Sequence, residues 1–317
     1  MNRADGDCSP AYIGRFAPSP SGPLHFGSLV AALASFLDAK SLDGQWLVRI
    51  EDLDPPRAMP GADQLIVSQL TAHGLIPDQP IVYQSQRLSQ YAAALEQLDQ
   101  NGHLYPCRCA RRDYRIHYPG TCRTQNLSPE PGATALRFRI DPSKFTLFDR
   151  LHGKLTWQYG ESMSDFIVRR KDGLHAYQLA VVIDDIDQKI SHIVRGADLL
   201  HAAPLQEALF AVFDKPSPTL LHIPVVLGND GRKLSKQAQA LPLDERNPSR
   251  NIRRALDFLN QQQPPPGSSL DSLLDYARKH WRPERIPKLM GRSETIGHRF
   301  SAHEPQLLVE PKTPQAQ

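Results

Sequence analysis

A short loop rich in proline and glycine, residues 18–28, lies between two apolar segments near the start of the chain. The segment before it, residues 12–17, is predicted to be a strand, and residues 29–37 are predicted to be a helix with Ser28 as its N-cap. Glycines in such a turn let the backbone approach a ligand, while free amide groups and the positive end of the helix dipole face an anion. The pattern predicts a strand, tight loop and helix that bind phosphate, with His25 where the phosphate arrives.

A second segment, residues 233–236, carries two lysines three positions apart. It follows the turn-forming residues 229–231, which come after an apolar strand candidate at 221–227. Two ammonium groups on a loop suit a triphosphate, because positioned cations stabilise the charge that develops during attack at the α-phosphorus. Taken alone, this segment would be a solvated basic turn and His25 an ordinary loop histidine. Their order and separation predict one ATP site formed by both.

The remaining hydrophobic pattern alternates between strand-like and helix-like stretches, which is typical of an α/β fold. Strands are expected at residues 45–50, 81–84, 174–183 and 189–194, and helices at 61–73, 88–98 and 198–213. These elements predict a Rossmann-type doubly wound parallel sheet, whose ligands bind beyond the carboxyl ends of the strands. Between residues 106 and 164 the pattern changes to short strands, such as 135–140, and a turn at Gly153, which predicts an insertion.

Composition sets broad limits on location and partners. A hydrophobic content of 40% allows a substantial core, and the net charge of +3 is compatible with an RNA partner without requiring one. The longest apolar stretch, residues 29–37, is too short to span a bilayer, and the N-terminus carries Asp5 and Asp7 rather than an apolar signal. We therefore expect a cytoplasmic protein with no membrane partner.

Three cysteines gather in the predicted insertion: Cys107, Cys109 and Cys122. In a cytoplasmic chain this grouping favours a metal over disulfides. Zinc takes four ligands in a tetrahedron, so one more is needed. Tyr118 is an unusual candidate because its phenol must lose a proton, although a bound cation lowers such a pKa. His103 and His117 are the conventional alternatives, and three idle thiols are the reading without a metal.

The two ATP segments resemble those of class I aminoacyl-tRNA synthetases. His-Phe-Gly-Ser at 25–28 stands in place of their His-Ile-Gly-His element, and Lys-Leu-Ser-Lys at 233–236 in place of Lys-Met-Ser-Lys. Residues 15–20, 47–54 and 193–198 resemble the glutamyl branch in the same order. Closer still, the chain resembles the glutamyl-queuosine tRNA(Asp) synthetase family, a shortened relative without the anticodon-binding domain. It departs from the wider class at Ser28, which replaces the second histidine.

The resemblance implies a class I catalytic domain with a zinc-containing insertion similar to the acceptor-binding insertion, and a helical C-terminal region similar to the stem-contact region. Only about 80 residues follow Lys236, fewer than the roughly 100 to 150 of a usual domain, so no anticodon-binding domain is expected. The expected divisions are a first catalytic half at residues 1–105, the inserted subdomain at 106–164, the second catalytic half at 165–242, the stem-contact-like region at 243–295 and a disordered tail at 296–317.

The resemblance also implies the site residues. ATP, with Mg²⁺, is assigned to His25, Gly27, Ser28, Lys233 and Lys236, of which His25 and Lys236 are the catalytic groups. Glutamate needs cations for two carboxylates and an anion for its ammonium group. Its expected ligands are Arg15, Ser19, Glu51, Tyr177 and Arg195. Without the resemblance, Glu51 would be a solvated strand end and Tyr177 a half-buried strand aromatic. The family's Cys-x-Cys and Tyr-x-x-x-Cys pattern assigns one structural zinc to Cys107, Cys109, Tyr118 and Cys122.

The implied function is a ligase reaction in which L-glutamate is activated by ATP and transferred to queuosine in tRNA(Asp). A monomer is expected. A compact glutamyl-tRNA synthetase that charges the 3′ end of tRNA is one alternative, which the short remainder after Lys236 disfavours. A non-catalytic RNA-binding paralogue is another. The presence of Arg15, His25, Glu51 and Lys236 disfavours it, because a regulator needs no complete adenylation set.

Overall fold

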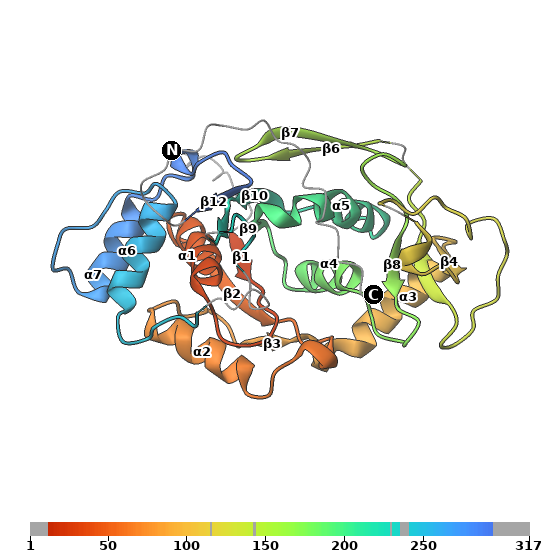
Figure 1. Cartoon of the computed structure of the whole chain (residues 1–317), viewed down its shortest axis with the longest axis horizontal. Coiled ribbons are helices and arrows are strands. Elements are labelled where there is room, and N and C mark those ends of the chain that lie inside the picture. Colours follow the sequence, from red (N-terminus) through yellow and green to blue (C-terminus); the bar gives the residue numbers. More distant parts are fainter. Residues whose placement is uncertain (1–11, 115, 142–143, 229, 235–240, 294–317) are drawn as a thin grey trace, which may run out of the picture.

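The computed structural model describes residues 12–293 except 115, 142–143, 229 and 235–240. Its centre is a seven-stranded sheet in the order β3-β2-β1-β9-β10-β6-β7 (Figure 1). The strands are β1 (Ile13–Phe16), β2 (Gln45–Ile50), β3 (Val82–Tyr83), β6 (Lys144–Asp149), β7 (Gly153–Gln158), β9 (His192–Gly196) and β10 (Thr219–Ile223). All but β7 run parallel, which confirms the predicted mostly parallel α/β sheet. The strand order changes direction at β1, so its carboxyl end is the expected ligand position.

Helices cover both faces of this sheet because successive side chains of a strand point to opposite sides. On β1, a Cβ at Gly14 would lie 3.7 Å from Ala39 of α1, whereas Arg15 pairs with Asp185 of α4. One hydrophobic core therefore forms around α1 and another around α3, α4 and α5. The helices are α1 (Phe26–Lys40), α2 (Ala62–Ala72), α3 (Leu88–Gln100), α4 (Tyr177–Asp187), α5 (Ala203–Val212), α6 (Pro248–Phe258) and α7 (Leu270–Lys279).

The predicted strand at residues 174–183 is wrong, because this segment begins helix α4. Its residues from Leu179 to Asp185 are all buried, so no polar face reveals the helical period. A continuous apolar run of this kind is compatible with either a buried strand or a buried helix. The correction places Tyr177 at the first position of a helix rather than in a strand.

Two further predictions needed adjustment. Helix α1 begins at Phe26, and its N-cap is His25 rather than Ser28, because the imidazole accepts a hydrogen bond from the Ser28 backbone N–H. The expected strand at 221–227 is interrupted at Pro224. Strand β10 ends before this proline in the main sheet, and β11 (Val225–Leu227) pairs instead with β12 (Gly291–Ser293).

The small sheet that contains β4 and β8 and the C-terminal helices α6 and α7 lie at opposite ends of the molecule (Figure 1). Strands β4 (Leu104–Cys107), β5 (Ala135–Phe138) and β8 (Phe166–Arg169) form a small antiparallel sheet, while the β6–β7 hairpin joins the main sheet through β10. Helices α6 and α7 pack against α1. No helix in the described part of the chain has the length and apolarity needed to cross a membrane. The tail predicted to be disordered, residues 296–317, lies outside the described residues.

Candidate active site

The two predicted ATP segments meet beside strand β11. His25 caps α1, and a Cβ on Gly27 would lie 3.1 Å from the His25 ring and 3.6 Å from Val226, so a side chain here would crowd the His25 ring. The carbonyl of Val226 in turn accepts a hydrogen bond of 2.7 Å from the backbone of Leu234. The loop that carries His25 and the loop that carries Lys233 are therefore neighbours, although they are far apart in the sequence.

The lysines of the second segment are only partly described. The ammonium group of Lys233 forms an ion pair with Asp198, which follows strand β9. Lys236 lies outside the described residues. Binding a triphosphate through Lys233 would require exchanging the carboxylate of Asp198 for phosphate, which both partners permit because they are partly exposed.

The residues predicted to bind glutamate come together at the carboxyl edge of the sheet. Arg15 lies on β1, Glu51 follows β2, Arg195 lies on β9 and Tyr177 begins α4. Desolvation raises the pKa of the Tyr177 phenol; Glu51 raises it further, and Arg195 and Arg15 oppose the shift. The other three groups thus all lie close enough to Tyr177 to shift its pKa. Tyr177 is 37% exposed, and Ser19 is exposed in the loop after β1.

Arg195 has the arrangement expected of a side chain that binds a carboxylate. Its side chain is buried, and burial lowers its pKa. Nε donates a hydrogen bond of 2.9 Å to His222, and Nη1 donates one of 2.7 Å to Gln206. Nη2 is buried and has no hydrogen-bond partner among the described residues. An unpaired buried donor is costly unless a ligand satisfies it. The site therefore offers a fixed cationic donor to an anion.

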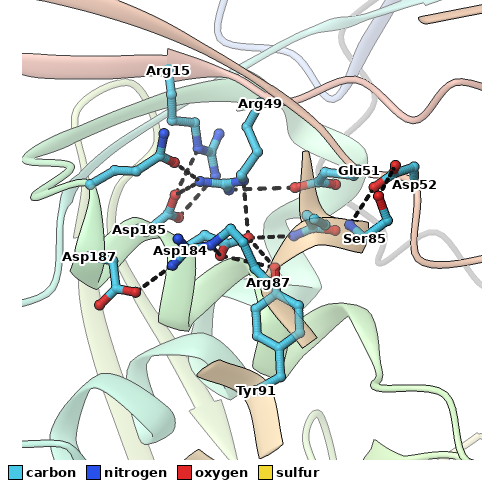
Figure 2. Close-up of polar contacts among 12 residues, drawn as sticks. Arg15, Arg49, Glu51, Asp52, Ser85, Arg87, Tyr91, Asp184, Asp185 and Asp187 are labelled. Atoms are coloured by element: carbon cyan, nitrogen blue, oxygen red, sulfur yellow. Dashed lines mark hydrogen bonds and ion pairs between the residues drawn. The ribbon is translucent and has the colours of Figure 1, made fainter. Parts of the chain in front are cut away.

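A network of buried ion pairs supports the same edge (Figure 2). Both Nε and Nη2 of Arg15 lie 3.2 Å from the carboxylate of Asp185, which also accepts a bond of 2.8 Å from Arg49. Burial opposes ionisation of Asp185, but Arg15 and Arg49 outweigh it and lower its pKa. Asp184 similarly accepts hydrogen bonds from Arg87 and Tyr91. Asp185 therefore fixes Arg15 beneath the site.

Glu51 lies at one edge of this network, next to Arg49. Its carboxylate lies 3.5 Å from Arg49, and only 8% of the side chain is exposed, so it is not a solvated strand end. Burial raises its pKa to about 7, and the nearby Arg49 and Arg15 counteract part of that rise. In the free protein this carboxyl group therefore changes charge near neutral pH, and only its ionised form can pair with an ammonium group.

We expect ionisation of Glu51 to raise the activity of the protein and to lower its stability. The kcat/KM for an amino acid held by ionised Glu51 should fall about tenfold per pH unit below pH 7. Because the folded-state pKa exceeds the ordinary value of 4.5, the stability contributed by protonated Glu51 is complete below pH 4.5 and is lost as the pH rises to about 7. Glu51→Gln avoids this loss. Thermal denaturation of ligand-free protein should show its Tm rising relative to the parent between pH 4.5 and 7; an unchanged difference would contradict the assignment.

The three cysteines predicted to bind a metal also come together. Their sulfur atoms all lie within 4.8 Å of one another, and Cys109 and Cys122 are 3.6 Å apart. Tetrahedral zinc with bonds of about 2.3 Å needs sulfurs roughly 3.8 Å apart, so the group fits. The hydroxyl of Tyr118 lies 3.5 Å from the Cys107 sulfur. No histidine of the described residues belongs to the group, which removes support for His103 and His117 as the fourth ligand.

Comparison with known proteins identifies the family. Residues 13–250 match the model of the catalytic domain of class I tRNA synthetases (E and Q). A glutamyl-Q tRNA(Asp) synthetase from Thiobacillus denitrificans is 48% identical, over 87% of this chain and 95% of that protein. One from Vibrio parahaemolyticus is 45% identical, over 87% and 94%. The chain belongs to the glutamyl-Q tRNA(Asp) synthetase family.

Solved structures support the fold. A glutamate tRNA ligase from Elizabethkingia meningosepticum, crystallised with its amino acid, superposes with a TM-score of 0.74 at 24% identity, covering 90% of this chain and 67% of that one. Glutamate-tRNA synthetase from Elizabethkingia anophelis gives a TM-score of 0.76 at the same identity. At this level of identity the likeness establishes only the fold of this chain. The assignment of its site depends on the geometry described above.

Sequence reasoning missed the residues that hold the predicted ligands in place. Asp184 and Asp185 carried a usable signal, because two carboxylates inside an apolar run must find cationic partners. Arg49 and His222 likewise lie within strands that are mainly apolar. Gln206 gave no such signal, because glutamine is unremarkable on a helix. The sequence thus shows which charged residues lie within apolar segments, but it does not show which of them pair with one another.

Proposed function

We propose that this protein uses ATP to activate glutamate and transfers it to the queuosine base in the anticodon loop of tRNA(Asp). The observation that supports the activation step is the buried Nη2 of Arg195, which lacks a hydrogen-bond partner within the described part of the chain. Arg195 lies near Arg15 and Tyr177, and Tyr177 in turn lies near Glu51. Two guanidinium groups match the carboxylates of glutamate, and Glu51 matches its ammonium group. The proposed acceptor, queuosine in tRNA(Asp), is supported by the names of the relatives that are 44–48% identical to this chain.

Activation begins with attack of the glutamate α-carboxylate on the α-phosphorus of ATP, which gives glutamyl-adenylate and releases pyrophosphate. Positioning and charge stabilisation suffice for this step, so no enzyme nucleophile is required. The ATP ligands in this proposal are His25, Gly27, Ser28, Lys233 and Lys236. Mg²⁺ bound with ATP would share the phosphate charge. The glutamate ligands are Arg15, Ser19, Glu51, Tyr177 and Arg195.

In the second step, a hydroxyl of the queuosine cyclopentene diol attacks the activated carbonyl, forming an ester and releasing AMP. A modified base in a single-stranded loop can be splayed into a protein pocket. We assign the catalytic fold to residues 1–105 and 165–242, the inserted subdomain to 106–164 and a stem-contact-like region to 243–295. We propose that the protein acts as a monomer on the anticodon loop.

The test uses ATP, labelled glutamate and two samples of tRNA, one from cells that make queuosine and one from cells that cannot. Label on the first sample alone supports the proposal, and nuclease digestion should place it on the anticodon fragment. Equal labelling of both, at the 3′ end, would identify a compact glutamyl-tRNA synthetase instead. Absence of label together with absence of glutamate-dependent pyrophosphate exchange would identify a non-catalytic paralogue.

We further propose that Cys107, Cys109, Tyr118 and Cys122 hold one structural zinc ion. Arg137 supports this set, because its Nε lies 3.1 Å from the Cys107 sulfur and its guanidinium group lies 3.7 Å from the centre of the Tyr118 ring. A closed site with four protein ligands offers no position for substrate, so the ion would stabilise the insertion.

Cys107→Ser is expected to reduce bound zinc from about one per chain to well below half, and to lower the Tm of the protein, because the site contributes folding energy. Elemental analysis after gel filtration measures the first effect and thermal denaturation the second. Cys8→Ser, a cysteine outside the proposed set, is the control and should retain its zinc. Parent protein without zinc, at unchanged stability after chelator treatment, would contradict the assignment.

A further inference from the structure

A chain of buried hydrogen bonds leads from the β6–β7 hairpin to the proposed glutamate site. Asp149 at the end of β6 lies 2.7 Å from Nδ1 of His222 on β10, and Nε2 of His222 accepts a bond of 2.9 Å from Nε of Arg195 on β9. The three residues are 1%, 0% and 5% exposed, respectively. Each link therefore lies in the protein interior, where an unsatisfied group is costly and the geometry is restricted.

The partners determine the state of the imidazole. Ionised Asp149 can only accept, so Nδ1 of His222 must carry the proton, and Arg195 can only donate, so Nε2 must be the unprotonated nitrogen. Burial lowers the pKa of His222 to about 4; Asp149 opposes this shift and Arg195 adds to it. The ring is therefore neutral at physiological pH. It presents a lone pair to Arg195 in a fixed direction.

Both ends of the chain are anchored. The other oxygen of Asp149 accepts hydrogen bonds of 2.9 Å from the backbones of Leu151 and His152, which form the hairpin turn. At Arg195, Nη1 donates to Gln206 on α5. With Nε and Nη1 committed, the plane of the guanidinium group is fixed. Only Nη2 is left without a partner among the described residues.

We propose that Asp149 and His222 are positioning residues that orient Arg195 so that its Nη2 binds a carboxylate of glutamate. The inference rests on the proposed function and adds to it a second layer of residues that determine affinity for the amino acid. The layer starts in the β6–β7 hairpin, so the inserted region contributes to the glutamate site without touching the substrate. The proposed ATP site lies beside β11 and does not include these contacts.

The test is glutamate-dependent ATP–pyrophosphate exchange by His222→Leu and His222→Gln. Leucine removes the acceptor for Arg195, so the KM for glutamate should rise about ten- to a hundredfold, while the KM for ATP stays within about twofold. Glutamine offers a carbonyl oxygen near the position of Nε2 and should recover most of the lost affinity. His73→Leu is the matched control, because His73 is also a fully buried, hydrogen-bonded histidine, but it contacts Asn251 rather than the site.

The outcomes separate the two proposals. A parent protein without glutamate-dependent exchange overturns the proposed function and this inference with it. An active parent with an unchanged KM for glutamate in His222→Leu overturns the inference alone. Equal effects of His222→Leu and His222→Gln, or a similar effect of His73→Leu, would show a structural role and also overturn it. If His222→Leu does not fold, Asp149→Asn serves instead, because an amide facing Nδ1 favours the other tautomer and should raise the same KM.

Discussion

Replacement of Arg195 by leucine is expected to raise the KM for glutamate in pyrophosphate exchange by at least a few hundredfold, on the scale of about 3–5 kcal/mol for removing one partner of a buried charge pair. In the ligand-free protein Arg195 is buried and forms no ion pair with a carboxylate of the described residues. Its charge is therefore available for the substrate. The KM for ATP should stay within about twofold, because the proposed ATP site lies beside β11.

Arg195→Lys is the informative control for this prediction. Lysine keeps the positive charge but loses the fork of donors that binds His222, Gln206 and a carboxylate together. We expect an intermediate loss, about ten- to a hundredfold in the KM for glutamate. If Arg195→Leu activates glutamate with the parent KM, the pocket is wrongly assigned. An equal loss for glutamate and ATP would indicate a damaged fold, which circular dichroism would reveal.

The same variants test how Arg195 and His222 act together. If His222 acts only through Arg195, then adding His222→Leu to Arg195→Leu should change the KM for glutamate no further. Residues in one hydrogen-bonded network are expected to be non-additive in this way. Additive effects would mean that His222 contributes to the site by another route.

The sequence points to the proposed glutamate ligands more directly than to the framework that holds them. Motif segments that resemble the glutamyl branch single out Arg15, Glu51 and Arg195, and the structure places all three near the carboxyl ends of neighbouring strands. Helix α4 was mistaken for a strand because its burial on all sides hides the helical period. The consequences were linked: with α4 taken as a strand, Asp185 could not be placed beside Arg15.

The inserted region shows the same limit. Cys107, Cys109 and Cys122 could be grouped from spacing, since the thiols lie close in the chain. The pairing of Asp149 with His222 joins a hairpin of the insertion to a strand of the main sheet. Such a contact depends on tertiary packing, and local patterns do not encode it. The one sign of this contact in the sequence is a histidine, His222, within a mainly apolar strand.

Asp185→Asn is expected to be the most destabilising single change in the site. Asp185 compensates two buried guanidinium groups, those of Arg15 and Arg49, and the amide that replaces it carries no charge. Removing one partner of a buried ion pair costs about 3–5 kcal/mol, because the remaining charge stays buried. Urea unfolding should therefore show a loss of this size, and the KM for glutamate should rise as Arg15 loses its support.

Asp187→Asn is the matched control, since it makes the same chemical change on the same helix. Asp187 pairs with Arg87 but is 46% exposed, and exposed pairs contribute only about 0–1 kcal/mol. The two variants thus compare the loss of a buried charge with the loss of an exposed charge on the same helix. Equal, small losses in both would mean that solvent reaches Asp185 and that Arg15 does not depend on it. A large loss of stability in Asp185→Asn alone, together with a raised KM for glutamate, would show that the buried ion pairs of Asp185 support the proposed glutamate site.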